Sequence, residues 1–245
     1  MIADPKASGG GRRVVLATPT YAGPYPAYCD ALEATHYAFE KAGISFGVTF
    51  KYRSPYISHA RAEMLRKALD AGADDIVFVD HDMEWKPEDM IRLVQTPGDV
   101  VSALYRFKLE PEEYMGAIAQ GPDGEPIVRN DGCIKADWIP AGFMKITKEG
   151  VDRYMRAYPE LCFGPKFALW VDLFNHGAED GLWWGEDYAF SRRWNAMGGD
   201  IWVLPDIDLI HHDSDRAYAG NYHQWLRRQP GGDLHAAQPL TKSAA

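Results

Sequence analysis

Two carboxylates one residue apart stand in the stretch VFVDHDMEW, residues 77–85. The apolar run before them predicts a buried strand, and Asp80 and Asp82 follow where that strand ends. Side chains at i and i+2 leave an extended strand on the same face, so both acids could bind one cation, and carboxylate oxygens suit Mg²⁺ or Mn²⁺. His81 should point the other way, as a packing or supporting group. The alternative is that the acids cap the turn into the next helix, and the bare motif does not decide between the two.

A second pair of acids opens the stretch GEDYAFSRRW, residues 185–194. Aromatic residues follow Asp187 three and seven positions later, which predicts that its carboxylate lies on the inward face of a helix, with Glu186 one position round. Burial beside Trp183 and Trp184 would raise the pKa of the carboxyl group, as a general base requires. The alternative is simple, because the helix dipole favours acids in any first helical turn.

Two adjacent histidines end the stretch PDIDLIHH, residues 205–212. A histidine at the end of a late strand could complete a metal site begun by Asp82. Neighbouring side chains on a strand point to opposite faces, so only one of His211 and His212 is expected to bind the ion. A pair of capping or solvent-exposed histidines is the alternative.

The composition is that of an acidic globular protein: 245 residues, 46% hydrophobic, with a formal net charge of −9. No apolar run approaches the length of a membrane span, and the N-terminal stretch has no apolar core of a secretory signal. The three scattered cysteines fit reduced thiols, which indicates a cytoplasmic protein. The acidic balance argues against general nucleic-acid binding, which needs clustered lysine and arginine.

The first half of the chain alternates predicted strands with predicted helices. Strands are expected at 13–17, 44–52, 74–80 and 99–107, and helices at 26–42, 59–72 and 86–94. This order predicts an α/β fold with a mostly parallel sheet, whose ligands bind at the carboxyl ends of the strands.

The second half is more mixed. A β-rich insertion or hairpin is expected at 108–140, helices at 147–157 and 186–197, and a last strand at 200–212. We therefore expect one folded domain over 13–228, divided at 107 into a nucleotide-sugar half and an acceptor half. Residues 1–12 and 229–245 are expected to be flexible tails.

The ordered set of stretches resembles the GT-A superfamily of nucleotide-sugar-dependent glycosyltransferases, family 2 in style. The stretches are VVLATPTY, HARAEMLRKAL, VFVDHDMEW, PAGFMKI, GEDYAF and IDLIHH, and they span most of the chain. Small proteins of this form resemble those of bacteriophages and bacterial surface-glycan clusters. The residues after the histidines depart from the family, which often has a small residue and a glycine there.

The resemblance implies a role for each matching residue. Asp80 would contact ribose or metal, Asp82 would coordinate Mn²⁺ or Mg²⁺, and His211 would be the third protein ligand. Asp187 would be the base that deprotonates the acceptor hydroxyl, with Glu186 beside it. The remaining donor-binding residues implied in this way are Thr18, Pro19, Thr20, Tyr21, Arg61, His81 and Gly142.

The main hypothesis is transfer of a sugar from a nucleotide diphosphate sugar, with UDP favoured, to a hydroxyl group by an inverting route. Trp183 and Trp184 are candidates for stacking on the acceptor sugar. The acceptor could be a glycan, a protein, a small molecule or, in a virus acting in host cytoplasm, a hydroxylated DNA base. Two alternatives stay open: a metal-dependent phosphoesterase or nuclease built from Asp80, Asp82, His211 and His212, and a non-catalytic nucleotide-sugar-binding module.

Overall fold

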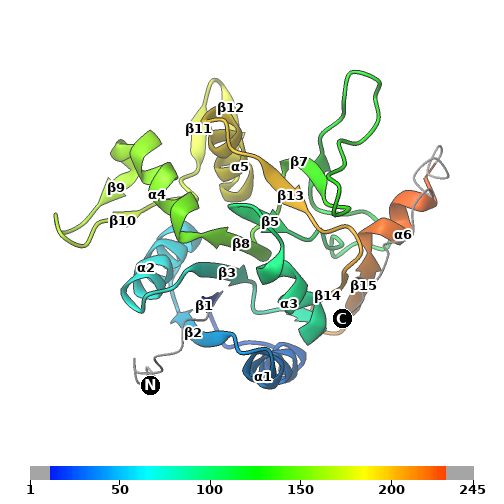
Figure 1. Ribbon diagram of the computed structural model, residues 1–245, viewed down its shortest axis with the longest axis horizontal. Helices are drawn as coiled ribbons and strands as arrows, with labels where there is room; N and C mark the ends of the chain where they lie inside the picture. The colour runs from blue at the N-terminus through cyan, green and yellow to red at the C-terminus, as the bar shows by residue number, and fades with distance from the viewer. Residues whose placement is uncertain (1–11, 230–245) are drawn as a thin grey trace.

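A computed structural model describes residues 12–229, so the tails expected at 1–12 and 229–245 lie almost wholly outside the described residues. The centre is an eight-stranded sheet with the order β2-β1-β3-β8-β5-β13-β7-β6 (Figure 1). Its strands are β1 (Arg13–Thr20), β2 (Ser45–Tyr52), β3 (Asp75–Val79), β5 (Val100–Ser102), β6 (Ala117–Ile118), β7 (Ile134–Trp138), β8 (Phe143–Thr147) and β13 (Ile201–Val203).

The first half of the sheet is parallel, as the sequence predicts. Strand β1 pairs in parallel with β2 on one side and with β3 on the other. The connections are the helices α1 (Pro26–Lys41) and α2 (Ile57–Asp70), and α3 (Pro87–Gln95) leads on to β5. Strand β1 runs three residues beyond its predicted end, and these residues pair only with β2, so the missing N–H of Pro19 lies on an open side. The predicted α/β fold class is confirmed.

One strand from the second half enters this parallel series. Strand β8 lies between β3 and β5 and is antiparallel to both. The four strands of the first half therefore still run in one direction, although β5 and β3 are not neighbours. Strand β5 is also much shorter than the predicted 99–107, because the chain leaves the sheet after Ser102.

The sheet is buried on both faces, which explains its continuous apolar runs. Alternate residues of β1 and β3 enter two separate hydrophobic clusters. Helices α2, α4 (Lys148–Ala157) and α5 (Glu186–Ala196) supply side chains to one cluster, and α1 and α3 supply the other. Within residues 12–229, no helix combines the length and apolar character that crossing a bilayer requires.

The predicted β-rich insertion is present as an antiparallel pair of β6 and β7. Two further hairpins project from the second half, at separate places in Figure 1. They are formed by β9 (Cys162–Phe163) with β10 (Trp170–Val171), after a short 3-10 helix at Pro159–Leu161, and by β11 (Gly177–Glu179) with β12 (Leu182–Trp184). The second hairpin leads directly into α5.

The prediction of a single strand at 200–212 is wrong, because the structure has two strands there. They are β13 in the central sheet and β14 (Asp208–His212) in another sheet, and Pro205 lies in the break between them. Strand β14 lies between β15 (Ala217–Asn221) and β4 (Met83–Trp85), with α6 (Tyr222–Arg227) following. The register sets His211 opposite Met83, so the late histidines lie beside the acids that precede β4.

Candidate functional site

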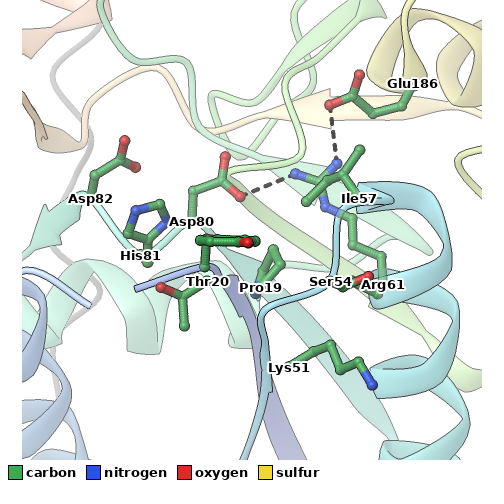
Figure 2. A pocket seen from close by; sticks show the side chains of 12 residues that line it. Pro19, Thr20, Lys51, Ser54, Ile57, Arg61, Asp80, His81, Asp82 and Glu186 are labelled. Carbon is green, nitrogen blue, oxygen red and sulfur yellow. Dashed lines mark hydrogen bonds and ion pairs between the residues drawn. The ribbon is translucent and has the colours of Figure 1, made fainter. Parts of the chain in front are cut away.

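A pocket of about 290 Å³ opens beyond the carboxyl ends of β1, β2 and β3 (Figure 2). This is the edge at which ligands bind in open α/β sheets. Five residues that the sequence analysis assigned to donor binding, Pro19 to Tyr21, Arg61 and His81, line it together with both acids of the DHD stretch. The complete lining is Pro19, Thr20, Tyr21, Lys51, Ser54, Ile57, Ala60, Arg61, Asp80, His81, Asp82 and Glu186.

Two residues predicted to face the donor have other surroundings. Thr18 is fully buried, and its hydroxyl forms a hydrogen bond of 2.5 Å with the hydroxyl of Tyr28 on α1. Gly142 leaves room for the protein's own groups, because a Cβ there would lie 2.2 Å from the Tyr105 hydroxyl and 2.7 Å from Oδ2 of Asp80. The prediction that Thr18 lines the pocket is therefore wrong. Gly142 acts by letting Asp80 and Tyr105 approach the backbone.

The DHD stretch is a turn, and the argument from an extended strand fails there. Strand β3 ends at Val79, and the N–H of Met83 donates to the carbonyl of Asp80 at 3.2 Å. Figure 2 shows the carboxylates of Asp80 and Asp82 on the same side of this turn, with His81 between them. They nevertheless have different partners, because Oδ1 of Asp80 accepts from Nη2 of Arg61 at 3.1 Å.

Arg61 is the centre of an acidic cluster. It is 2% exposed, and its Nη1 lies 3.4 Å from a carboxylate oxygen of Glu186 and 3.4 Å from one of Asp187. Its guanidinium also lies over the ring of Phe174, at 4.9 Å. Burial alone would lower the pKa of Arg61, but the charges of Asp80 and its two other acidic partners raise it. Arg61 therefore holds three acids around one buried positive charge.

Asp187 has the ionisation expected of a general base. It lies in the first turn of α5, and its side chain is 17% exposed. Burial is the largest cause that raises its pKa to about 7; the charge of Arg61 opposes this rise, while those of Glu186 and Asp80 add to it. A carboxyl group of this kind can take a proton near neutral pH.

Asp82 has the opposite environment. Its Oδ2 accepts from Nζ of Lys108 at 2.6 Å and lies 3.5 Å from Nε2 of His211. Burial alone would raise the pKa of Asp82, but the hydrogen bonds and charges of His211 and Lys108 outweigh it and hold the pKa below its ordinary value. Its other oxygen, Oδ1, is buried and has no hydrogen-bond partner among the described residues.

The two adjacent histidines separate as the strand geometry predicts. His211 turns to Asp82, whereas Nε2 of His212 pairs with Oε2 of Glu84 at 2.7 Å. Nδ1 of His211 lies 2.9 Å from the carbonyl oxygen of Arg106. A carbonyl only accepts, so Nδ1 carries a proton, and Nε2 is the ring nitrogen that faces Asp82.

The residues beside Asp82 fit one end of a divalent-ion site. A buried carboxylate oxygen without a partner and a histidine whose other nitrogen is fixed by a carbonyl are both typical of metal ligands. Across residues 12–229, however, no cluster of three or more histidine, cysteine or acidic side chains is placed to hold a metal. The predicted trio of Asp80, Asp82 and His211 is thus not assembled, because Asp80 is held by Arg61. Two protein ligands with substrate oxygens are a common arrangement for Mg²⁺.

The predicted acceptor tryptophans do not line the pocket. Trp183 is 72% exposed on the hairpin before α5. The indole N–H of Trp184 donates to the carbonyl of Glu179, and its ring lies under the guanidinium of Arg192. Trp183 therefore remains a candidate for contact with an acceptor, whereas Trp184 is occupied in holding the hairpin.

Three arginines of the second half that could contact nucleic acid are each paired with an acid. Arg153 pairs with Asp99, Arg192 with Glu179, and Arg228 with Glu112. The structure gives no support to DNA as an acceptor.

Sequence reasoning missed several residues of the site. The segment after β2 contributes Ser54 and Ile57 to the pocket, and the rule for carboxyl ends of parallel strands would have found this loop. Tyr105 is 2% exposed, and its ring packs on His211 at 5.0 Å. No local pattern marks Lys108, because only the folding of its loop brings it to Asp82.

No family model and no curated protein sequence matches the chain. Many solved structures resemble it, among them the following three. A glycosyltransferase involved in glycosylating the major capsid of PBCV-1 shares 7% identity over 60% of this chain and 65% of that one, with a TM-score of 0.34. A Drosophila β1,4-galactosyltransferase 7 mutant with manganese, UDP-Gal and xylobiose shares 11% over 95% and 82%, with a TM-score of 0.46.

The third structure is the inositol-1-phosphate CTP transferase from T. maritima, with 10% identity over 84% of this chain and 91% of that one and a TM-score of 0.43. The chain thus spans slightly less than two thirds of the first of these proteins. At these scores the three likenesses do not decide a function, and the chain's own residues must support one.

Proposed function

We propose that this protein is a metal-dependent glycosyltransferase that moves a sugar from a nucleotide diphosphate sugar to an acceptor hydroxyl. One observation carries the proposal: a carboxyl group with a pKa of about 7 pairs with Arg61 in the wall of a pocket at the carboxyl ends of parallel strands, and a second carboxylate, whose buried oxygen has no partner among residues 12–229, lines the same pocket. The first suits a proton acceptor and the second a cation site. Together they supply what transfer from a diphosphate to a hydroxyl requires.

The donor is expected to lie along the pocket with its diphosphate towards Asp82. Pro19, Thr20 and Tyr21 form one wall at the end of β1, where a nucleoside can bind. A diphosphate beside these carboxylates needs positive charge, which supports the need for a cation. Asp82 and His211 would hold a divalent ion, and such an ion, when bound, stabilises the charge that grows on the leaving diphosphate.

Asp187 is proposed as the base of a single displacement. Its carboxylate takes the proton of the acceptor hydroxyl while that oxygen forms a bond to C1 of the sugar. The bond from C1 to the phosphate oxygen breaks, and the nucleoside diphosphate leaves with the electron pair. Attack from the face opposite the diphosphate inverts the anomeric centre. Arg61 keeps Asp187 and Glu186 in place, and burial keeps the Asp187 carboxyl basic enough for this step.

We propose that donor binding and acceptor binding rest mainly on different halves of the chain. Residues 13–107 supply all the residues that line the pocket except Glu186, and residues 108–228 supply Asp187 and the exposed Trp183. We propose that a sugar acceptor approaches from the Trp183 side, and that UDP is the nucleotide, as the resemblance implies. Glycan, protein and small-molecule acceptors all fit this scheme.

The phosphoesterase alternative has weaker support. It requires Asp80, Asp82 and both histidines around one ion, yet His212 pairs with Glu84 and Asp80 with Arg61. Cleavage of a simple phosphodiester in the absence of any sugar would restore that alternative. Metal-dependent donor binding without transfer to any acceptor would favour a non-catalytic module instead.

Asp82→Asn tests the metal-dependent part of the proposal. We expect the wild-type protein to bind one nucleotide sugar more tightly with Mn²⁺ than without it, in calorimetry across a panel that includes UDP-sugars. Loss of the anionic ligand should remove that gain, a change of about tenfold or more in affinity. Glu84→Asn removes a carboxylate on the other side of the same turn and should retain the gain. Equal affinity with and without Mn²⁺ in the wild-type protein would contradict metal-dependent donor binding.

A further inference from the structure

Lys108 is the lysine that pairs with Asp82, the carboxylate proposed to hold a divalent ion. Its ammonium lies 2.6 Å from Oδ2 of Asp82, and within residues 12–229 this is its one hydrogen bond. The same oxygen is the one that faces Nε2 of His211, at 3.5 Å. An ion bound to this oxygen and to His211 would lie beside the Lys108 ammonium and be repelled by it, so the ion can bind there only if Lys108 moves.

The two cationic side chains that pair with the acids of the site, Arg61 and Lys108, differ in their freedom to move. Arg61 is 2% exposed and has three carboxylates around its guanidinium. Lys108 is 29% exposed and reaches Asp82 with a flexible four-carbon stem. Displacing Arg61 would leave three acids without their cation. Displacing Lys108 leaves only one acid without its lysine, and the arriving ion would neutralise that acid.

The backbone around Lys108 is fixed, so only the side chain needs to move. The carbonyl of Arg106 accepts from Nδ1 of His211. The guanidinium of Arg106 donates to the carbonyls of Leu109 and Glu110, at 3.2 and 3.3 Å. Glu110 is in turn paired with Arg216 beyond β14. One short segment thus orients His211 and delivers Lys108 to the same carboxylate.

We propose that Lys108 is an exchangeable counter-cation: it holds Asp82 until a divalent ion binds there, and then neutralises the donor diphosphate. The second half of this statement rests on the proposed function, and the first half does not. The exchange keeps positive charge beside Asp82 in both states. Lys108 is thereby a phosphate-binding residue of the donor complex and a competitor of the ion in the nucleotide-free protein.

Lys108→Met separates these two effects. We expect it to bind Mn²⁺ alone about tenfold more tightly than the wild-type protein, because the competing ammonium is gone. In saturating Mn²⁺ it should bind UDP about tenfold more weakly, because a charge on the phosphates is lost. Electron paramagnetic resonance counts free Mn²⁺ in the first titration, and calorimetry follows UDP in the second.

Two variants serve as controls. Lys86→Met removes a lysine that pairs with Asp208 outside the pocket, so it matches the change in net charge and should alter neither affinity. Lys108→Arg keeps the charge and should stay within a few-fold of wild type in the UDP titration. Thermal unfolding confirms that each variant is folded.

The outcomes are distinct. Opposite changes in the two affinities of Lys108→Met support the exchange. The exchange is overturned if Lys108→Met binds Mn²⁺ no more tightly than the wild-type protein, or if neither protein binds Mn²⁺. It is also overturned if the wild-type protein binds UDP and Lys108→Met binds it with the same affinity. If no nucleotide binds the wild-type protein while Lys108→Met gains Mn²⁺ affinity, the proposed function fails and the competition at Asp82 stands.

Discussion

Four carboxylates in and beside the pocket are paired with cations in two different ways. On one side, Asp80, Glu186 and Asp187 share the buried guanidinium of Arg61. On the other, Asp82 has Lys108 and His211 on one oxygen and none of the described residues on the other. The first side is closed by the protein itself, and the second has a displaceable partner and a free coordination position.

This difference moves the pKa values of Asp187 and Asp82 in opposite directions. The pKa of Asp187 is raised to about 7, with burial as the main cause, while that of Asp82 is lowered by its cationic neighbours against the effect of burial. Groups whose environments move their pKa values apart commonly divide acid–base and electrostatic roles. The Arg61 side is thus suited to proton transfer and the Asp82 side to cation binding.

The largest expected effect is on the Arg61 side. Asp187→Asn should lower the rate of sugar transfer by about 10²–10⁴-fold, because the amide cannot accept the proton. Donor affinity with Mn²⁺ should remain within a few-fold of wild type, since Asp82 is untouched. Single-turnover rates and calorimetry measure the two quantities. A near-wild-type rate would remove Asp187 as the base and with it the proposed contrast between the two sides.

Arg61→Met tests how firmly that side is closed. We expect a loss of about 2–4 kcal/mol in the free energy of unfolding, measured by urea denaturation. The loss should be below that of a fully buried unpaired charge, because Asp80 and Glu186 remain 28% and 32% exposed. Water can therefore take up part of their charge.

Arg66→Met is the matched control on the same helix. Arg66 pairs with Asp70, which is 61% exposed, so its loss should cost less than about 1 kcal/mol. Equal losses for the two variants would mean that Arg61 is no more structural than a surface arginine. In that case its role would be restricted to the ligand.

The sequence predicted most of the first half of the fold, because local patterns determine it. Strands β1 to β3 are buried on both faces and read as apolar runs, and the helices between them show 3.6-residue periodicity and glycine ends. The position of β8 between β3 and β5 could not be predicted in this way. It depends on long-range pairing, and nothing in the run FMKIT states which strands it will join.

The site was predicted to a similar extent. The stretches with acids and histidines were identified because their residue types are chemically rare in apolar surroundings. The two-residue period of a strand predicted that His211 and His212 point to opposite faces, and in the structure they face Asp82 and Glu84, respectively. The geometry of Asp80 and Asp82 was wrong because a turn replaces the extended chain, and Lys108 was missed because it comes from a loop far along the sequence.

The smallest expected effect concerns the like charges around Asp187. The proposed base acts when deprotonated, so transfer at subsaturating donor should rise with pH and level off above about 7. Glu186 raises the pKa of Asp187 through its negative charge, so Glu186→Gln should move the inflection to lower pH. The shift should be less than about one unit, because Glu186 is 32% exposed and water screens its charge.

The direction of this shift is the informative quantity. Loss of Glu186 should increase the relative rate at acidic pH and, since a weaker base accepts a proton less readily, slightly lower the plateau. Glu84→Gln removes a carboxylate paired with His212 and should leave the inflection in place. An upward shift for Glu186→Gln would mean that Glu186 does not act on Asp187 through its charge. Because Arg61 pairs with both acids, it would point instead to an arginine that moves when one of its partners is lost.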